Sequence, residues 1–271
     1  MKYEQLIYEK ANNIATITLN RPQVLNSITL QMVAELTDAV TTADKDDDVR
    51  VIIITGAGRG FCAGDDIGNV FGTDEKPGAA QAFKTREQQL SYLEKDRLYS
   101  GAGILLDINK PTIAAVNGVA VGYGCTVALL CDIRIASEKA RFAELFINVG
   151  IIPGEGLFQL PRIVGLGRAY ELLLTGDIID AAEAHRIGLV NKVVPPDQLM
   201  NEAVALATRI AQKAPMAIRL SKEGIRKGLN GPDDDFYQWK SLAQLFLMMS
   251  EDHLEASKAF LEKRKPVFKG K

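Results

Sequence analysis

Two stretches of the chain share one pattern, in which a short run of apolar residues leads into a turn rich in glycine. Residues 49–55 (VRVIIIT) lead into the first glycine turn, residues 56–65, and residues 112–116 (TIAAV) lead into the second glycine turn, residues 117–124. Such nearly continuous runs of β-branched residues predict strands that are buried on both faces, as in a parallel sheet. Glycine at both turns allows the backbone to approach a ligand closely.

The segment after the second glycine turn, residues 125–131 (CTVALLC), has the length and composition of a buried helix. The first N–H groups of a helix have no partner within it and carry the positive end of its dipole, so they suit an anion or an oxygen that becomes one. A tight connection without a ligand explains one such turn equally well. Two of them could aim two backbone N–H groups at one oxygen, which is the design of an oxyanion hole.

The remaining pattern predicts a mixed α/β protein. Strands are expected at residues 14–19 and 189–194. Apolar spacing or helix-forming composition predicts helices at residues 27–42, 81–106, 167–175, 181–186, 199–213, 215–228, 235–250 and 251–264. We therefore predict a β/α core over residues 1–196 and a helical C-terminal region over residues 197–271, which packs on the core or on another subunit.

The composition narrows the class of protein and its partners. With 271 residues and a net charge of -2, the chain gives no reason to expect a nucleic-acid or membrane partner. Its three cysteines, an odd number in apolar surroundings, favour reduced thiols in a cytoplasmic protein. No apolar run approaches the ~18 residues of a membrane-spanning helix, and no secretory signal is recognisable at residues 1–10. No cluster has metal-ligand spacing.

A series of short motifs resembles the enoyl-CoA hydratase/isomerase (crotonase) superfamily over essentially the whole chain. In order, the motifs occupy residues 20–22, 25–27, 60–67, 110–118, 131–132, 160–162, 188–191 and 260–266. The resemblance implies a spiral of ββα repeats with C-terminal helices used for trimerisation, as a homotrimer or a dimer of trimers. It also implies acyl-CoA thioester substrates, with coenzyme A as part of the substrate and no separate cofactor.

The resemblance further implies which residues contact the substrate. The two oxyanion donors would be the backbone N–H groups of Asp65 and Tyr123. The coenzyme A moiety would lie along Gln23, Val24 and Leu25. Its adenine would lie near Ala63, Asp66 and Ile67, and Phe260 and Lys263, from the same or a neighbouring subunit, would contact its nucleotide end. A solvated basic tail is the alternative for Lys263.

The sequence departs from the hydratase pattern at both acid/base positions. Hydratases of the family hold and split one water with two glutamates, whose positions are taken here by Thr126 and Phe146. We expect these two residues to line the acyl site. Glu144, two positions from Phe146, matches a family position that is not catalytic and is given no role. The two oxyanion donors are also unusual: Tyr123 replaces a glycine, and its phenol either shapes the acyl pocket or simply packs. The Asp65 carboxylate must face away or be hydrogen-bonded elsewhere.

Glu155, in the sequence Pro153-Gly154-Glu155-Gly156, is the candidate catalytic acid. In isomerases and a dehalogenase of the family, this loop carries the acid. We expect Glu155 to be buried against Phe146, Ile151 and Leu157, which would suit a proton shuttle.

The favoured prediction is therefore double-bond isomerisation through an enolate. The alternatives are a hydratase with atypical acid/base residues, a hydrolase or dehalogenase-like enzyme with Glu155 as nucleophile, and a non-catalytic coenzyme A-binding family member.

Overall fold

The computed structural model describes residues 2–66, 68, 72–73, 76–77 and 101–271. Its strands are β1 (Leu6–Ala11), β2 (Ile14–Leu19), β3 (Val51–Gly56), β4 (Gly72–Thr73), β5 (Lys76–Pro77), β6 (Thr112–Val116), β7 (Val119–Val121), β8 (Ile133–Ser137), β9 (Arg141–Ala143), β10 (Ile179–Asp180) and β11 (Lys192–Val194). The helices of the core are α1 (Leu30–Lys45), α5 (Ile104–Asp107), α6 (Tyr123–Leu130), α7 (Gly156–Val164), α8 (Leu166–Thr175), α9 (Ala181–Arg186) and α10 (Leu199–Ala211). Three further helices follow: α11 (Pro215–Asn230), α12 (Asp233–Met248) and α13 (Glu251–Leu261). Short 3-10 helices are η1 (Pro22–Val24), η3 (Gly101–Gly103), η4 (Leu145–Val149) and η5 (Pro196–Gln198).

A mostly parallel sheet forms the centre of the core. Within the described residues it has six strands in the order β1-β2-β3-β6-β8-β11, and only the β1–β2 pair is antiparallel. All five residues of β6 are buried, as are residues 51–55 of β3. The prediction of a parallel sheet from two uninterrupted apolar runs is therefore confirmed. A second sheet, in the order β10-β9-β7, lies beside the second glycine turn.

The pleat of β3 divides the hydrophobic core into two layers. Ile52 and Ile54 point into the layer that contains α1 and α6, whereas Val51 and Ile53 point into the layer covered by α10. Helix α10 buries residues spaced by four, which places them on one helical face. The layers match the alternation of side chains along a strand, so no polar face of β3 meets solvent.

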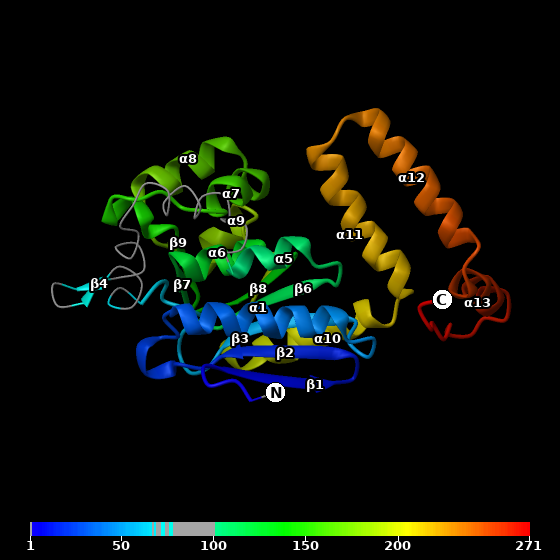
Figure 1. Cartoon of the computed structure of the whole chain (residues 1–271), viewed down its shortest axis with the longest axis horizontal. Coiled ribbons are helices and arrows are strands. Elements are labelled where there is room, and N and C mark those ends of the chain that lie inside the picture. The colour runs from blue at the N-terminus through cyan, green and yellow to red at the C-terminus, as the bar shows by residue number, and fades with distance from the viewer. Residues whose placement is uncertain (1, 67, 69–71, 74–75, 78–100) are drawn as a thin grey trace.

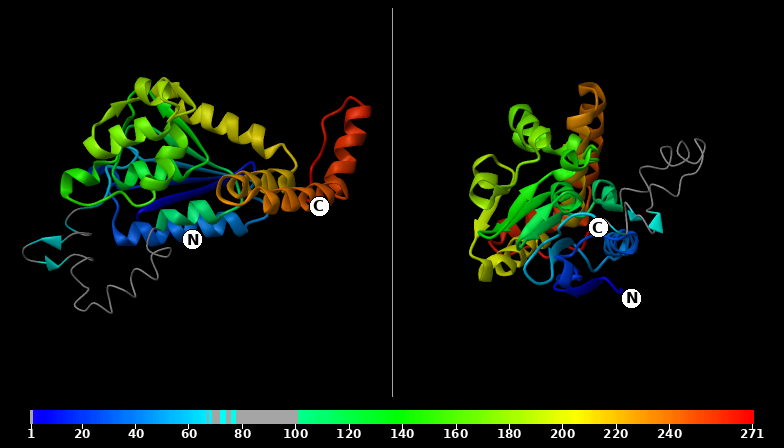
Figure 2. Two further views of the ribbon diagram at one scale, coloured as in Figure 1. Left: turned by 90° about the horizontal axis from the view of Figure 1, so that it is seen from above. Right: turned by 90° about the vertical axis from the view of Figure 1, so that its left-hand side faces the viewer.

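The predicted C-terminal helices are confirmed, and their arrangement refines the predicted division of the chain. The helix expected at residues 199–213 is α10, which packs on the central sheet and is therefore part of the core. The helices that extend away from the sheet begin with α11 (Figures 1 and 2). The helix expected at residues 81–106 lies almost wholly outside the described residues, which show only α5 at its end.

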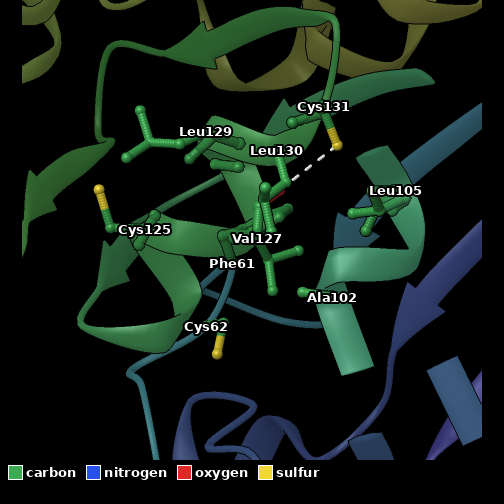
Figure 3. Packing of buried hydrophobic residues seen from close by; sticks show 14 of the residues in the cluster. Phe61, Cys62, Ala102, Leu105, Cys125, Val127, Leu129, Leu130 and Cys131 are labelled. Carbon is green, nitrogen blue, oxygen red and sulfur yellow. Dashed lines mark hydrogen bonds between the residues drawn. The ribbon is translucent and has the colours of Figure 1, made fainter. Parts of the chain in front are cut away.

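Helix α6 follows the second glycine turn and is buried along its length from Gly124 to Leu130. Figure 3 shows Val127 and Leu130 pointing toward Ala102 and Leu105, while Cys125 lies on the other side of the helix. Because α6 is surrounded by packed side chains, its position and the position of its first N–H groups are fixed by the core. Cys62, Cys125 and Cys131 are all buried free thiols.

Candidate active site

The two glycine turns are in direct contact. The N–H groups of Phe61 and Cys62 donate to the carbonyl of Val119 at 3.0 and 2.8 Å, and Val121 N–H donates back to the Cys62 carbonyl at 3.1 Å. Gly64 has φ +89°, and a Cβ built there would lie 2.9 Å from the Val121 carbonyl oxygen and 3.6 Å from the Tyr123 nitrogen. Segments far apart in the sequence are thus joined backbone to backbone.

Gly124 is the closest point of this junction. A Cβ at this position would lie 2.3 Å from the Cys62 carbonyl oxygen and 2.7 Å from the Cys62 Cβ. These atoms belong to a hydrogen-bonded backbone and to a fully buried side chain, so neither can move away cheaply. Glycine is therefore required for α6 to begin where it does.

Two asparagine side chains hold the first glycine turn in place. Asn26 is completely buried, and its Nδ2 donates to the carbonyls of Ala57, Gly60 and Phe61 at 2.9, 2.8 and 3.1 Å. Asn117 Nδ2 donates to the Gly60 carbonyl at 3.1 Å. The carbonyl groups of the first glycine turn thereby gain hydrogen-bond partners, which buried backbone groups need.

The N–H groups of Asp65 and Tyr123 lie on either side of the junction. Tyr123 is the first residue of α6, and among the described residues no backbone carbonyl accepts a hydrogen bond from either N–H group. Neither N–H group is therefore taken up by the backbone, although the Asp65 N–H group hydrogen-bonds to the residue's own carboxyl group. Their convergence on one oxygen stays a prediction from the resemblance.

The Asp65 carboxyl group is largely desolvated and is hydrogen-bonded to its own backbone N–H group. Desolvation raises the pKa of Asp65 to about 6, and the hydrogen bond with its own N–H group opposes this rise. The raised pKa shows that the surroundings disfavour the carboxylate, but a group with this pKa is still mostly ionised at pH 7. The neighbouring Asp66 instead pairs with Arg21, whose Nη1 lies 3.0 Å from the carboxylate.

The Tyr123 phenol has a packing role in the described structure. Its oxygen accepts a hydrogen bond from Ala102 N–H at 2.9 Å. Burial is the largest cause that raises the pKa of the phenol. Tyr123 thus anchors η3, at the end of the segment before α5, to the start of α6.

Glu155 is the N-cap residue of α7 and is half-buried. Its negative charge acts on both Tyr123 and Glu144, which places it beside the second glycine turn. The sequence analysis expected Glu155 to be buried against Phe146, Ile151 and Leu157. This is wrong for two of these residues, because Ile151 and Leu157 are themselves 38% and 44% exposed. Ile151 lies in the loop before α7 and Leu157 in its first turn, and neither is enclosed by the described residues.

The deeply buried carboxyl group of this region is that of Glu144, to which the sequence analysis gave no role. Only 2% of Glu144 is exposed, and Thr126 Oγ1 lies 3.1 and 3.3 Å from its two oxygens. Desolvation is the main cause that raises the pKa of Glu144 to about 8. A signal was available: β9 and η4 are apolar around Glu144, and a glutamate in such a run needs a partner.

The predicted acyl-site residues occupy two neighbouring elements. Thr126 is buried in the first turns of α6, and Phe146 is half-buried in η4. Glu144 lies two residues before Phe146 and bonds to Thr126, so it connects these elements. The structure therefore brings Tyr123, Thr126, Glu144 and Glu155 into one region.

The residues expected to contact coenzyme A lie along the first glycine turn. Gln23 and Val24 belong to η1 and are exposed, and Leu25 follows with φ +52°. The Ala63 N–H group donates to the Leu25 carbonyl at 2.9 Å, which joins η1 to the first glycine turn. Ile67 lies outside the described residues.

Phe260 and Lys263 lie at the opposite end of the sheet. The C-terminal tail reaches Arg50, which precedes β3, through a 2.8 Å hydrogen bond to the Phe268 carbonyl. The glycine turns, in contrast, follow the carboxyl ends of β3 and β6, and α13 stands apart from the core in Figure 1. Phe260 is 84% exposed and, like Lys263, lies away from the glycine turns of its own chain, so the contact of these residues with coenzyme A stays a prediction.

Among the described residues no group of three or more His, Cys, Asp or Glu side chains is placed to hold a metal ion. Within the same ranges, no helix combines the length and the apolar character that crossing a membrane requires.

The α/β core, with two glycine turns joined beside the start of a buried helix, is the arrangement that the resemblance to the enoyl-CoA hydratase/isomerase superfamily predicts. Comparison with known proteins supports this assignment. The family model for enoyl-CoA hydratase/isomerase matches residues 9–271. The chain is 40% identical over 275 residues to crotonyl-CoA hydratase of Syntrophomonas wolfei, covering 99% of each chain.

Two further relatives agree with this match. A short-chain-enoyl-CoA hydratase of Clostridium acetobutylicum is 39% identical over 98% of this chain and 97% of its own length. The crystal structure of an enoyl-CoA hydratase from Bacillus anthracis superimposes with a TM-score of 0.86 at 35% identity, covering 99% of this chain and 100% of that one. The chain belongs to the enoyl-CoA hydratase/isomerase family, whose members act on acyl-CoA thioesters, and it has the crotonase fold.

Proposed function

We propose that the protein is an enoyl-CoA hydratase, which adds water across the double bond of a 2-enoyl-CoA thioester. The observation that carries this proposal is the contact between the two glycine turns with Glu155 beside it. The names of the relatives support hydration over the isomerisation that the sequence analysis favoured.

The backbone donors act on the thioester carbonyl. When water attacks the β-carbon, the electron pair of the double bond moves through the α-carbon to the carbonyl oxygen, which becomes negatively charged. The N–H groups of Asp65 and Tyr123 would donate to that oxygen. Because they are fixed by the packed core, they need no rearrangement as the charge develops.

Glu155 moves the proton in this proposal. As a carboxylate it takes a proton from the attacking water while the water oxygen bonds to the β-carbon. The carboxyl group then returns that proton to the α-carbon, and the enolate collapses to the thioester. Oxygen and both hydrogens of one water end in the product, and Glu155 recovers its charge. Only one carboxyl group is required to touch the reacting atoms.

Replacing Glu155 with glutamine tests this role. Glu155→Gln is expected to lower kcat for a short 2-enoyl-CoA by ~10²–10⁴-fold, because the amide cannot accept the proton of water. Loss of the conjugated double bond is followed by absorbance, and the product formed in ¹⁸O-labelled water is weighed by mass spectrometry. Glu202→Gln, which changes an exposed glutamate paired with Lys192, is the control and should keep wild-type turnover.

The labelled water also separates the competing reactions. Hydration incorporates one ¹⁸O at the β-carbon, whereas isomerisation of a 3-enoyl-CoA incorporates none. Wild-type turnover of a 3-enoyl-CoA without ¹⁸O, together with no turnover of a 2-enoyl-CoA, would replace hydration with isomerisation. Full activity of Glu155→Gln on both substrates would remove Glu155 from the mechanism.

We further propose that the enzyme is cytoplasmic and assembles as a trimer or a dimer of trimers through α11 to α13. The support is the exposed apolar surface of these helices, which is large for a monomer. Its most exposed apolar members are Ile225, Leu229, Tyr237, Leu242, Leu245, Phe246, Met249, Leu254, Phe260 and Leu261. In such an assembly Phe260 and Lys263 would reach the coenzyme A of a neighbouring subunit. A monomeric mass in analytical ultracentrifugation would contradict the assembly and this contact.

A further inference from the structure

Glu144 is a buried carboxyl group without a cation. It precedes η4, and burial is the first cause of its raised pKa. Among the described residues no lysine, arginine or histidine is within ion-pair distance of its carboxylate. A carboxylate buried in this way is strongly disfavoured relative to the neutral acid. Glu144 therefore carries a proton at neutral pH.

The carboxyl group of Glu144 is held between the two helices that carry the proposed machinery. On one side it bonds to Thr126 Oγ1, and Thr126 lies three residues after Tyr123 on the same face of α6. On the other side a Cβ at Gly156, the first residue of α7, would lie 2.9 Å from the Glu144 Cδ. Glu155 immediately precedes this glycine, so Glu144 contacts both the donor helix and the helix that Glu155 caps.

The groups that face Glu144 are few. From α6 they are Thr126 and the Cys125 thiol, and from the start of α7 the charge of Glu155 acts on it. From the remaining elements packed against it, the described neighbours are apolar, among them Phe142, Leu160 and Leu172 around a cavity of about 10 Å³. A cavity of this size has room for about one water molecule at most, so it offers little solvation to a charge.

The charge state of Glu144 then decides what the site can do. In the structure the Thr126 hydroxyl donates to the Glu144 carboxyl group, and it can do so in either charge state. Ionisation of Glu144 therefore adds one thing, a second negative charge near Glu155 and the developing oxyanion. This charge opposes enolate formation, because like charges raise each other's energy at low dielectric.

We propose that Glu144 is a positioning residue that acts in its protonated form, fixing Thr126 and the start of α7, and that its ionisation turns the site off in alkaline solution. This inference rests on the proposed oxyanion chemistry. It assigns a role to a residue that does not itself touch the substrate.

The pH profile of kcat/KM tests the inference in the intact enzyme. The wild-type enzyme is expected to lose activity as the pH rises through about 8, where Glu144 ionises. Glu144→Gln keeps the shape and hydrogen bonding of the neutral acid, so its profile should lack this alkaline limb while kcat at pH 7 falls by ~10-fold or less. Glu202→Gln serves as the matched control and should retain the wild-type limb.

Two further variants separate positioning from a merely structural role. Glu144→Leu removes the hydrogen bond and is expected to lower kcat by ~100-fold or more, with a smaller change in KM. Thr126→Val removes the partner, so adding Glu144→Gln to it should change kcat little further. An unchanged alkaline limb in Glu144→Gln would overturn the inference, as would a Glu144→Gln effect that is equal with and without Thr126.

A readout without substrate keeps this test independent of the proposed function. With ¹³C-labelled glutamate, the side-chain resonance that disappears in Glu144→Gln should titrate near pH 8 in the wild-type protein. A resonance that titrates near the ordinary glutamate value of about 4.3 overturns the inference whatever the reaction is. Titration near pH 8 in a protein that turns over no acyl-CoA would instead refute the proposed function alone.

Discussion

Replacing Gly124 with alanine is expected to lower kcat/KM by ~100-fold or more, because small displacements of catalytic groups have effects of this size. The added Cβ would lie 2.3 Å from the Cys62 carbonyl oxygen, so α6 and the first glycine turn must move apart. The Tyr123 N–H group belongs to α6, whereas the Asp65 N–H group belongs to the first glycine turn. Their separation therefore changes directly, even though no catalytic side chain is altered.

The measurement is steady-state kinetics on a short 2-enoyl-CoA together with thermal unfolding. Gly167→Ala is the matched control, since Gly167 lies in α8 with no other heavy atom within 4 Å of an added Cβ. This control should keep its activity and gain up to ~1 kcal/mol in stability, as alanine favours helix over glycine. Wild-type kcat/KM in folded Gly124→Ala would mean that the contact between the turns does not set the donor geometry.

Replacing Asn26 with aspartate is expected to lower the free energy of unfolding by ~3–5 kcal/mol at pH 7, because it buries an unpaired charge. Asn26 Nδ2 donates to three carbonyl oxygens within 3.1 Å. A carboxylate at this position has no hydrogen to donate and repels all three oxygens. The first glycine turn would lose its buried anchor, and activity would fall with stability.

The sign of the pH dependence makes this prediction specific. The introduced carboxyl group ionises near pH 4 in the unfolded chain and at a higher pH in the folded protein, because its surroundings disfavour charge. The destabilisation relative to wild type should therefore be smallest below pH ~4 and grow as the pH rises above it. Urea unfolding at pH 4 and pH 7 measures the difference.

Asn191→Asp is the control for this substitution. Asn191 is exposed, and its Oδ1 only accepts a hydrogen bond from the Arg134 N–H group at 3.0 Å. A carboxylate oxygen accepts the same bond, so the stability change should stay within ~0.5 kcal/mol. If Asn26→Asp destabilises the protein equally little, or independently of pH, then the hydrogen bonds of Asn26 do not hold the first glycine turn in place.

The parts of the fold that the sequence predicts are those that depend on local composition. The run of apolar residues in β3 and β6 indicates burial on both faces, and this is what the structure has. The short β7 was not expected, because three residues between two glycines carry too little pattern. Helix α7 was also missed, since Pro161 within it and the glycines before it are typical of loops.

For the candidate site too, the sequence predicts some features and not others. The two glycine turns stand out in the sequence because glycine is needed where backbones touch, and the structure brings them into contact at Gly64 and Gly124. The role of the Tyr123 phenol does not follow from the sequence, because its partner, Ala102 N–H, comes from a different element. Glu144 was set aside because it matches a family position that is not catalytic, although the apolar residues around it already indicated burial.

The sequence by itself determined the family, the parallel sheet, the two glycine turns and the helical C-terminal region. Each of these is encoded by residues that are close along the chain. Only the tertiary structure decided that α10 belongs to the core, that Phe260 and Lys263 lie far from the site of their own subunit, and that Glu144 is the buried carboxyl group. Burial and proximity depend on contacts between distant segments, and these contacts set the solvation on which the charge of a carboxyl group depends.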